Sequence, residues 1–491
     1  MADSPTPSPF IRTKIIATVG PASSSESMIA RLIDGSVDVF RLNFSHGTLD
    51  EHARTLNTIE TVRRAKGVMV AVMGDLCGPK IRVDPVEGDS FELAAGRRID
   101  LVAGHVVGTA GQISTNRPEL LNELKVGDRL LIDDGNVRLR VVEVHAGRVT
   151  CVCEVSGRIS THKGVNAPDT AMQMSALTAK DHEDLAWALD QRLDYIAMSF
   201  VRSAADLREL RELVPISHGD CRVVAKIETI RATENLDEII ESADAVLVAR
   251  GDLGVEMDLA QVPLIQKKIS QRCLVAGKPV IVATQMLQSM VDSPTATRAE
   301  VSDVANAIFD SADCVMLSAE TSIGKYPLES VSMMARIAEQ TEAFIGSAAT
   351  EHLDGAATLR PMATAVAHGA ALVAKELSAK AVAVWTQTGN TVRLLSKCRL
   401  AAPVVGLSPD ERVCRRMCLN YGVIPIRLAR QEHITAMLRD VDEALLSRKL
   451  VERGDLVVVV AGTHLRQVGS TNALLIHLVG DTSDAMPAIT G

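Results

Sequence analysis

Short apolar runs that end in polar residues recur along most of the chain. Before residue 347 these runs span residues 14–19, 37–42, 68–75, 194–199, 222–227, 243–249, 279–283 and 313–317. Helical spacing fills most of the intervals, as at Ile29, Leu32 and Ile33. Thr178 with Asp181 resembles a capping box that begins another helix. Because near-continuous apolar strands alternate with helices, the pattern predicts a closed parallel (β/α)8 barrel, a TIM barrel, in preference to an open sheet.

Polar residues follow the carboxyl ends of these runs. They are Arg41 and Asn43, Asp75, Ser199, Lys226 and Glu228, Asp252, Thr284, and Ser318 with Glu320. In a barrel of this class the active site lies at the carboxyl ends of the strands. Randomly scattered loop polarity would not gather there, so we expect these residues to surround a site.

The stretch from Arg222 to Glu256 carries the densest charge. Lys226 and Glu228 lie two residues apart, so both can project from the same side of a strand. Arg250 and Asp252 follow the next apolar run. Charge among apolar residues is costly unless it is paired or bound to a metal, so this clustering predicts a binding site. The alternatives for Glu228 and Asp252 are a solvated loop or a salt bridge with Arg250, and the alternative for Lys226 is a buried ion pair with Glu228.

One interval, residues 84–168, is far longer than a single helix needs. Its residues alternate between apolar and polar, as in Asn136–Val141, and turn pairs such as Glu87-Gly88 separate short segments. This predicts an inserted small β-barrel domain between barrel segments 11–83 and 169–346. Pro85 and Pro168 flank the insert, which we expect to act as a lid that excludes water from the strand ends.

Residues 347–491 alternate again and predict a C-terminal doubly wound α/β domain of regulatory function. Its apolar runs are residues 381–385, 404–407, 423–426, 456–461 and 474–479, and the small, polar residues 347–355 are expected to link it to the barrel. The turn Thr386, Gln387, Thr388, Gly389, Asn390, Thr391 leaves a strand and opens a helix. Its hydroxyls and backbone N–H groups could hold the phosphate of an effector, and plain helix capping explains them equally well.

Composition narrows the classes of partner. The chain has 491 residues, 47% hydrophobic and 23% charged, with a formal net charge of −9, which disfavours nucleic acid and anionic membranes as partners. No apolar stretch approaches membrane-spanning length, and residues 1–10 form a Pro- and Ser-rich tail, so we expect a cytoplasmic protein. The nine cysteines are scattered, and neither Cys151 with Cys153 nor Cys414 with Cys418 has a matching pair nearby. We therefore expect buried thiols rather than a zinc site.

Ten short sequence motifs, spread over much of the chain, resemble those of the pyruvate kinase family. The matching segments are RTKIIATVGPAS from Arg12, RLNFSHG from Arg41, GDLCGPKIR from Gly74, KGVNAP from Lys163, LTAKD from Leu177, SFVR from Ser199, VAKIE from Val224, ARGDLG from Ala249, ATQML from Ala283 and TRAEV from Thr297. The resemblance implies transfer of a phosphoryl group from phosphoenolpyruvate to ADP, giving ATP and pyruvate. It also implies a homotetramer.

The resemblance assigns roles to individual residues. Glu228 and Asp252 would bind Mg²⁺, or Mn²⁺, through hard oxygen atoms. Lys226 and Arg41 would hold the transferring phosphoryl group, and the backbone of Gly251 and Asp252 would meet the substrate carboxylate. Thr284 would organise protonation of the enolate carbon. Asn43, Arg82 and Lys180 match positions on the nucleotide side, although Arg82 and Lys180 could also be ordinary surface cations.

The sequence departs from the commonest family pattern between Gly74 and Arg82. Many members bind K⁺ through residues that match Asn43, Ser45, Asp75 and a threonine, but this chain has Leu76 in place of the threonine. Lys80 stands where those members carry glutamate. We therefore expect the potassium-independent type, in which the Lys80 ammonium replaces the monovalent ion.

Two other functions are compatible with a barrel. A lyase or aldolase could use Lys226 as a Schiff base, but that lysine would need a depressed pKa, and Glu228 favours its charged form. A catalytically inactive metabolite sensor could keep only the turn at Thr386. The presence of Lys226, Glu228, Asp252 and Thr284 argues against the sensor.

Overall fold

The structure is a computed structural model, and it describes residues 10–170, 175–214, 221–347, 361–431, 433–462 and 471–481. The expected tail, apart from Phe10, and nearly all of the expected linker at 347–355 lie outside these residues. No helix in the described residues is long and apolar enough to cross a membrane.

The predicted barrel is confirmed. Its strands are β1 (Lys14–Thr18), β2 (Val37–Asn43), β3 (Ala71–Asp75), β13 (Tyr195–Met198), β14 (Arg222–Ile227), β15 (Ala245–Ala249), β16 (Val280–Ala283) and β17 (Cys314–Leu317), closed in the order β1-β17-β16-β15-β14-β13-β3-β2 with parallel neighbours. Every strand starts where the apolar runs predict, within three residues. Side chains from alternate positions, among them Ile16, Val224 and Leu247, fill the interior.

Helices surround the barrel. They are α1 (Glu26–Asp34), α2 (Leu49–Lys66), α3 (Ala179–Asp190), α4 (Ala204–Leu213), α5 (Ile230–Glu234), α6 (Leu236–Ser242), α7 (Arg250–Glu256), α8 (Val262–Val275), α9 (Arg298–Phe309), α10 (Ala319–Ser322) and α11 (Pro327–Ser347). The capping box predicted at Thr178 and Asp181 begins α3. Ile29 and Leu32 of α1 are fully buried against the strands. Their apolar faces join the outer sides of the strands in one core.

The insert is a separate β domain with its own core. A seven-stranded sheet runs in the order β4 (Ile81–Arg82), β12 (Gly164–Asn166), β8 (Arg129–Ile132), β9 (Val137–His145), β10 (Arg148–Val155), β6 (Arg98–Val102) and β7 (Gln112–Ile113). The strands β5 (Ser90–Leu93) and β11 (Gly157–Ser160) pair beside it, and both sheets contribute to one apolar cluster. The predicted small barrel is confirmed. The residues that extend β4 and β7 meet at an antiparallel bridge between Val83 and Thr115, where the Asn116 N–H donates to the Arg82 carbonyl at 3.0 Å and the Asp84 N–H donates to the Ser114 carbonyl at 3.0 Å.

The C-terminal domain is doubly wound, as predicted. Its sheet has the order β20 (Val423–Arg427), β19 (Val404–Ser408), β18 (Ala381–Trp385), β21 (Leu456–Gly462) and β22 (Thr471–Leu478), with only β22 antiparallel to its neighbour. One face packs on α12 (Pro361–Glu376), α13 (Asn390–Ser396) and α14 (Glu411–Met417), and the other packs on α15 (Ile434–Ser447).

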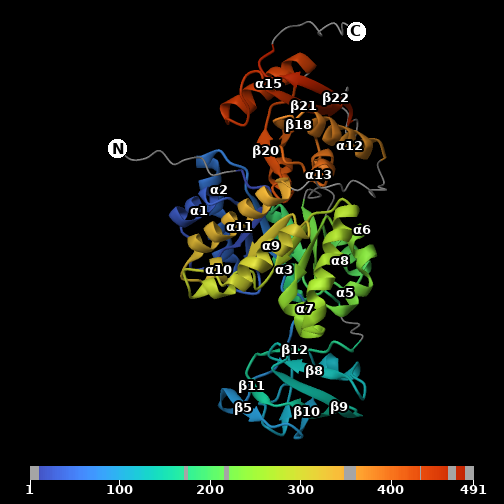
Figure 1. Cartoon of the computed structure of the whole chain (residues 1–491). Helices are drawn as coiled ribbons and strands as arrows, with labels where there is room; N and C mark the ends of the chain where they lie inside the picture. The colour runs from blue at the N-terminus through green and yellow to red at the C-terminus, as the bar shows by residue number, and fades with distance from the viewer. Residues whose placement is uncertain are drawn as a thin grey trace.

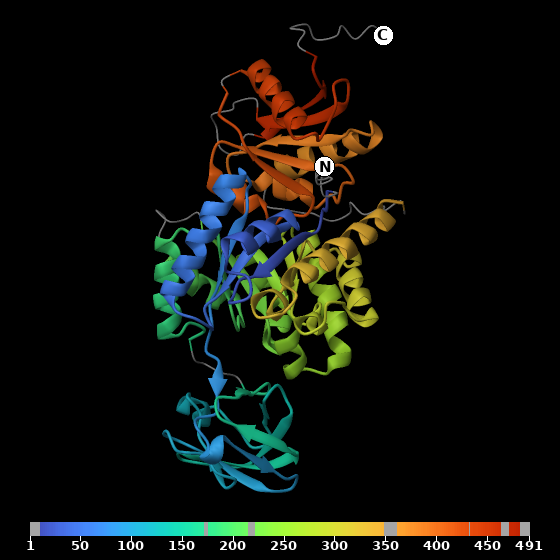
Figure 2. The same ribbon diagram turned by 90° about the vertical axis from the view of Figure 1, so that its left-hand side faces the viewer.

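The insert and the C-terminal domain lie at opposite ends of the barrel (Figures 1 and 2). The insert leaves the barrel after β3, at the carboxyl ends of the strands. The C-terminal domain faces the amino ends. The barrel therefore separates any site at the strand carboxyl ends from the C-terminal domain by the length of its strands.

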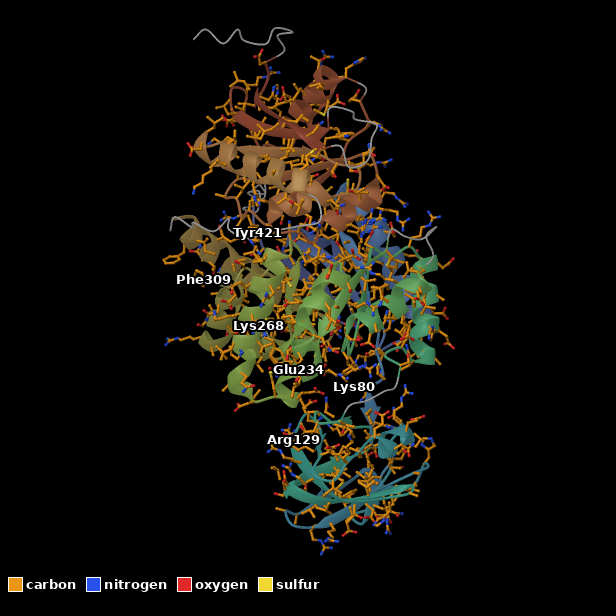
Figure 3. The ribbon with its side chains drawn as sticks, turned by 90° about the vertical axis from the view of Figure 1, so that its right-hand side faces the viewer. Lys80, Arg129, Glu234, Lys268, Phe309 and Tyr421 are labelled. Atoms are coloured by element: carbon orange, nitrogen blue, oxygen red, sulfur yellow. The ribbon has the colours of Figure 1, made fainter. Side chains whose placement is uncertain are left out.

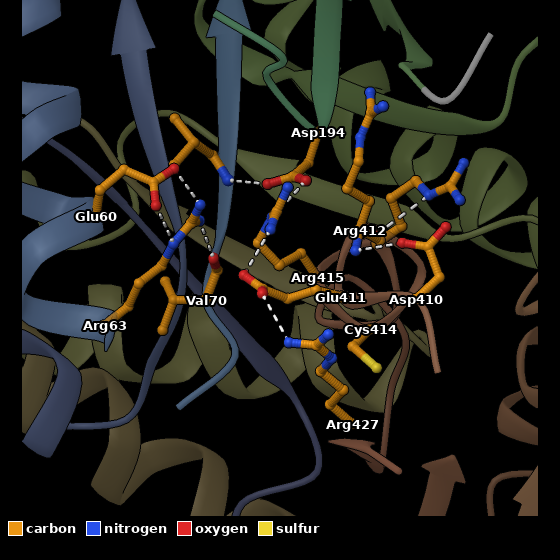
Figure 4. Close-up of polar contacts among 12 residues, drawn as sticks. Glu60, Arg63, Val70, Asp194, Asp410, Glu411, Arg412, Cys414, Arg415 and Arg427 are labelled. Carbon is orange, nitrogen blue, oxygen red and sulfur yellow. Dashed lines mark hydrogen bonds and ion pairs between the residues drawn. The ribbon is translucent and has the colours of Figure 1, made fainter. Parts of the chain in front are cut away.

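Two buried aspartates fasten the C-terminal domain to the amino ends of the strands. Asp194 accepts hydrogen bonds from the Val72 backbone N–H at 3.0 Å and from Arg415 Nε at 2.9 Å. Figure 4 shows Arg415 reaching on to Glu411, at 2.9 Å. Asp313 is fully buried and likewise joins the two domains. It accepts hydrogen bonds from the Val280 N–H at 2.7 Å and from Lys397 Nζ at 2.5 Å. Each carboxylate thus joins barrel strands to a cation of the other domain.

Candidate active site

A buried charged cluster occupies the carboxyl ends of β2, β3 and β14. Asp75 lies at its centre, with Arg41 Nη2 at 2.6 Å from Oδ2 and Lys226 Nζ at 3.2 Å from Oδ1. Lys226 Nζ also lies 2.8 Å from Glu228 Oε1 and donates to Ser199 Oγ at 2.7 Å. Each of these side chains is buried. The sequence places Lys226 beside Glu228 correctly, but the central position of Asp75 emerges only from the fold.

The charges in this cluster support one another. Burial alone would lower the pKa of Lys226, but Asp75 and Glu228 raise it well above its usual value. Burial alone would raise the pKa of Asp75, but Lys226 and Arg41 lower it. The site therefore presents a protonated lysine and a guanidinium on a fixed carboxylate at neutral pH. Such pre-positioned positive charge suits an anionic group that changes charge during reaction.

Glu228 and Asp252 form a carboxylate pair that could hold a divalent cation. Burial raises the pKa of Glu228; Lys226 opposes this effect and the nearby Asp252 adds to it. The second Glu228 oxygen accepts from the Phe200 N–H at 2.8 Å, which fixes the carboxylate. The described residues contain no cluster of three or more acidic, His or Cys ligands. Two carboxylates with the remaining positions left to water and phosphate oxygens is the usual ligand set of Mg²⁺, so the residues fit this ion.

Lys80 lies where the barrel and the insert meet (Figure 3). Its ammonium is 3.9 Å from Asp252 Oδ1, and both side chains are about one-third exposed. Asn43 and Ser45 lie together, since Asn43 Oδ1 accepts from the Ser45 N–H at 3.2 Å. The structure therefore places the Lys80 charge next to Asp252, and Asp75 is already paired with Arg41 and Lys226.

Thr284 lies in a strained turn after β16. Its φ is +68° and that of Gln285 is +53°, and a β-branched residue rarely adopts a positive φ. The Thr284 hydroxyl accepts from the Gly251 N–H at 2.8 Å. Arg250 Nη2 donates to the Thr284 carbonyl at 2.8 Å, while its Nη1 lies 2.6 Å from Asp303 Oδ2 on α9. These contacts hold the Thr284 hydroxyl beside the start of α7.

Arg250 is therefore not a member of the carboxylate cluster. The sequence groups it with Asp252 by proximity, but its guanidinium forms an ion pair with Asp303. The reason is geometric, because α7 begins at Arg250 and directs this side chain toward the 284–286 turn. Asp303 carries no motif that identifies it in the sequence, since it is one acidic residue on an amphipathic helix.

Two cations predicted for the nucleotide side lie away from the central cluster. Lys180 donates to the Phe44 carbonyl at 2.8 Å and to Asp184 at 2.7 Å. Arg82 Nη1 donates to the His162 carbonyl in the insert at 3.0 Å. Lys180 is thus on the barrel and Arg82 on the insert, on either side of the junction between them.

A buried carboxylate at this junction was not predicted from the sequence. Glu256, 6% exposed, accepts from Asn166 Nδ2 of the insert at 3.4 Å and from the Ile230 N–H of the barrel at 3.2 Å. Burial raises the pKa of Glu256 to about 7, with smaller contributions from Asp252 and Glu228. A hollow of about 40 Å³ beside it is lined by Lys80 as well. Its signal in the sequence was only an acidic residue at the end of a predicted helix.

The turn predicted to hold an effector opens α13. Thr386 Oγ1 accepts from the Gly389 N–H at 2.9 Å, and Gly389 has a φ of +81°. The Thr391 hydroxyl lies 2.9 Å from that of Thr471. Thr388 and Asn390 line a cavity between the barrel and the C-terminal domain, whereas Thr386 and Thr391 are buried and occupied by these internal contacts.

The nine cysteines are free thiols; seven are buried as expected, whereas Cys77 and Cys398 are half-buried. Burial raises the pKa of Cys151 and of Cys414 to about 12. Neutral thiols of this kind serve packing rather than nucleophilic chemistry.

Comparison with known proteins agrees with this geometry. Residues 10–331 match the family model for the pyruvate kinase barrel domain, and residues 364–477 match that for the pyruvate kinase alpha/beta domain. A pyruvate kinase of Agrobacterium vitis is 42% identical over 474 residues, covering 96% of this chain and 98% of the relative. One of Geobacillus stearothermophilus is 40% identical over 478 residues, covering 96% and 81%. The crystal structure of a pyruvate kinase from Cryptosporidium parvum matches with a TM-score of 0.87 and 32% identity, over 96% of both chains.

Proposed function

The chain belongs to the pyruvate kinase family, and from this premise we propose how its residues divide the work of the reaction. The family's reaction transfers a phosphoryl group from phosphoenolpyruvate to ADP, with Mg²⁺, and yields ATP and pyruvate as the last step of glycolysis. The enzyme is a phosphotransferase. The two alternatives raised by the sequence, a lyase and an inactive sensor, are not favoured.

Arg41 and Lys226 bind the phosphoryl group as it moves. This proposal is supported by the position of Asp75, which lies within 3.2 Å of both cations. One carboxylate does not neutralise two cations completely. The phosphoryl group spreads negative charge over its oxygens in a loose transition state, and fixed cations stabilise that charge without reorganising. The raised pKa of Lys226 keeps it protonated, which suits this role and not a Schiff base.

Glu228 and Asp252 hold the divalent metal. The ion, Mg²⁺ or Mn²⁺, supplies Lewis-acid polarisation of phosphate oxygens when it is bound. Glu228 is oriented by the Phe200 N–H at 2.8 Å. Asp252 is the more accessible of the two, with its side chain 30% exposed, so it faces the space where substrate enters.

Thr284 organises protonation of the enolate after transfer. Its hydroxyl is held by the Gly251 N–H, and the same peptide is the expected donor to the substrate carboxylate. When the carboxylate accepts that N–H, the Thr284 hydroxyl is released to order a water molecule above the enolate carbon. A threonine hydroxyl is too weak an acid to act as the sole donor, so water carries the proton.

Asn43, Arg82 and Lys180 bind the nucleotide between barrel and insert, and the insert closes over it as a lid. The position of Arg82 on the insert and of Lys180 on the barrel supports this division, because a nucleotide that bridges them would draw the two domains together.

The enzyme requires no K⁺. Leu76 is 1% exposed and apolar, so it offers no oxygen ligand, and the Lys80 ammonium lies 3.9 Å from Asp252. A fixed ammonium at this place supplies the positive charge that a monovalent cation otherwise supplies. Asn43, Ser45 and Asp75 then serve hydrogen bonding and charge pairing.

Three further properties belong to the same proposal. The enzyme is a homotetramer, as the resemblance to its family implies, and it is cytoplasmic. A phosphorylated effector binds near the turn at Thr386, Thr388, Gly389, Asn390 and Thr391. The domain boundaries at residues 84, 168 and 347 also stay predictions.

The observation that carries the proposal is the buried cluster of Arg41, Asp75 and Lys226 beside the Glu228 and Asp252 pair. A lactate-dehydrogenase-coupled assay with phosphoenolpyruvate, ADP and Mg²⁺ tests it. We expect turnover that is lost without Mg²⁺ and restored by Mn²⁺. Folded protein without turnover would exclude the proposed roles.

A further inference from the structure

Two segments of chain connect the insert to the barrel, and both pass the same buried carboxylate. Residues 79–81 lead into β4, and residues 165–167 run out of β12. Both segments line the hollow of about 40 Å³ at the junction, and Glu256 is the one carboxylate among the described residues of that lining. An acid at the base of both connections is placed where it can influence how the insert sits on the barrel.

The two oxygen atoms of Glu256 contact two different domains. Oε1 accepts a hydrogen bond from Asn166 Nδ2 at 3.4 Å, and Oε2 accepts one from the Ile230 N–H at 3.2 Å. The backbone of Asn166 belongs to the sheet of the insert, because it pairs with Leu131 of β8. Ile230 is the first residue of α5 in the barrel. The carboxyl group therefore bridges a strand of the insert and a helix of the barrel.

On the insert side, this contact leads to the residues proposed for the nucleotide. Asn166 ends β12, and Gly164 of the same strand pairs with Arg82 of β4. Lys80 immediately precedes β4, and its ammonium lies 3.9 Å from Asp252 Oδ1. Because β12 and β4 are hydrogen-bonded neighbours in one sheet, a displacement of Asn166 carries Arg82 with it. The position of Asn166 thus sets where Arg82 and Lys80 lie over the strand ends.

On the barrel side, the same contact leads to the carboxylates proposed for the metal. Glu256 is the last residue of α7, the helix that contains Asp252 in its first turn. Ile230, the other partner of Glu256, follows Glu228 by two residues. The carboxyl group therefore fixes the insert against the two segments that carry Glu228 and Asp252.

The contact is of a kind that a moving domain can break and remake. Burial raises the pKa of Glu256 to about 7, and the negative charges of Asp252 and Glu228 add to this effect. Near neutral pH much of the group is uncharged, so its bond to an amide lacks the strength of a charge-assisted bond. Arg202 also lines the hollow, but it forms an ion pair with Asp206 at 3.2 Å.

We propose that Glu256 and Asn166 are positioning residues for the phosphoryl transfer. Their contact holds the insert at the angle at which Arg82 and Lys80 meet the nucleotide. Both residues act through the insert rather than by touching the substrate. This inference rests on the proposed function, in which the insert closes over the nucleotide as a lid.

Steady-state kinetics of the full-length chain, with ADP and phosphoenolpyruvate varied separately, test the proposal. Asn166→Ala removes the insert's half of the contact and leaves every barrel residue in place. It should raise the KM for ADP about three- to tenfold, the effect of one lost hydrogen bond. The KM for phosphoenolpyruvate should stay nearly unchanged, because the groups assigned to this substrate lie on the barrel.

A double-mutant cycle shows whether the two residues act together. Glu256→Ala should raise the KM for ADP by a similar factor. The variant with both substitutions should show no more than the larger single effect, because each change removes the same contact. Calorimetric titration of ADP with Mg²⁺ repeats the comparison without turnover, and the Kd should change as the KM does.

Glu256→Gln is the conservative variant that should restore the contact. Its amide oxygen can accept from the Ile230 N–H, and its Nε2 can donate to Asn166 Oδ1 once the asparagine amide turns over. The KM for ADP should therefore stay close to that of the natural protein. Glu234→Ala is the matched control, because Glu234 is an exposed acid at the end of α5 (Figure 3). It should leave both KM values unchanged.

Three results would overturn the positioning role. They are an unchanged KM and Kd for ADP in Asn166→Ala, single effects that add fully in the double variant, and an equal rise of both KM values in Asn166→Ala. The last result would indicate a general loss of structure, which thermal unfolding of each variant measures independently. Natural protein that binds ADP without turnover would count against the proposed function, while the Kd values would still decide the role of this contact.

Discussion

Replacing Asp75 by asparagine isolates the shared anchor of the two phosphoryl-binding cations. The carboxylate is 1% exposed and lies 2.6 Å from Arg41 and 3.2 Å from Lys226. Its removal leaves two buried cations facing a neutral amide. Breaking a buried ion pair in this way costs about 3–5 kcal/mol of unfolding free energy. Because both cations also lose their orientation, kcat should fall about 10²- to 10³-fold.

The stability part of this prediction has a definite pH dependence. Lys226 and Arg41 lower the pKa of Asp75 against the effect of burial. A depressed carboxyl pKa stabilises the fold above the unfolded-state pKa, and this contribution disappears as the pH falls through the folded-state value. The difference between the natural protein and Asp75→Asn should therefore persist from about pH 5 to 8 and shrink only in acid.

Urea unfolding followed by tryptophan fluorescence measures the effect in the barrel. The chain has two tryptophans; Trp187 lies on α3 and Trp385 lies in β18. A Trp385→Phe background leaves Trp187 to report on the barrel alone. Asp38→Asn is the control, because Asp38 pairs with Lys14 at 2.9 Å near the amino end of β2, away from the cluster. It should lose stability and keep kcat. An Asp75→Asn protein with kcat within twofold of the original would refute the reasoning.

Three other changes give distinct outcomes. Asp303→Asn removes the ion-pair partner of Arg250. Because Asp303 is 40% exposed, the stability should change little, while kcat should fall about tenfold or more with a smaller effect on KM. An unchanged kcat would exclude the positioning role. Glu256→Gln should become more stable than the natural protein as pH rises from about 5 to 8, by on the order of 2–3 kcal/mol. The raised pKa of about 7 means that the carboxyl stabilises the fold only while protonated, and a pH-independent difference in urea midpoint would contradict this. In sodium or Tris salts the natural protein should turn over fully, whereas Lys80→Glu should need K⁺; activity of the natural protein only with K⁺ would show that Lys80 does not replace the ion.

The barrel and the C-terminal sheet could be predicted from the sequence because their strands are apolar on both faces. Runs such as 245–249 and 381–385 have no polar interruption, so their ends are sharp and their type is clear. The insert was predictable as a small β-barrel from its alternating pattern, but the pairing that closes it was not. Both β4 and β7 are only two residues long, and the residues that extend them meet at a bridge between Val83 and Thr115.

Some contacts among the active-site residues could likewise be predicted from the sequence, and others could not. Lys226 and Glu228 were predictable as neighbours because they lie two residues apart where β14 ends. Asp75 was expected near a monovalent cation, yet its contact with Lys226 depends on β3 and β14 lying on either side of β13 in the closed sheet. Asp303 and Glu256 act through contacts with distant segments, at the 284–286 turn and in the insert. No local pattern encodes such contacts, so sequence reasoning could not find them.

Binding of Mn²⁺ in the presence of phosphoenolpyruvate, followed by the electron paramagnetic resonance signal of the free ion, tests the central claim most directly. The account predicts one ion per chain, held by Glu228 and Asp252. Asp252→Asn should weaken binding at least about tenfold and lower the rate of pyruvate formation in parallel. Affinity and rate that remain unchanged in Asp252→Asn would contradict the assignment of the site.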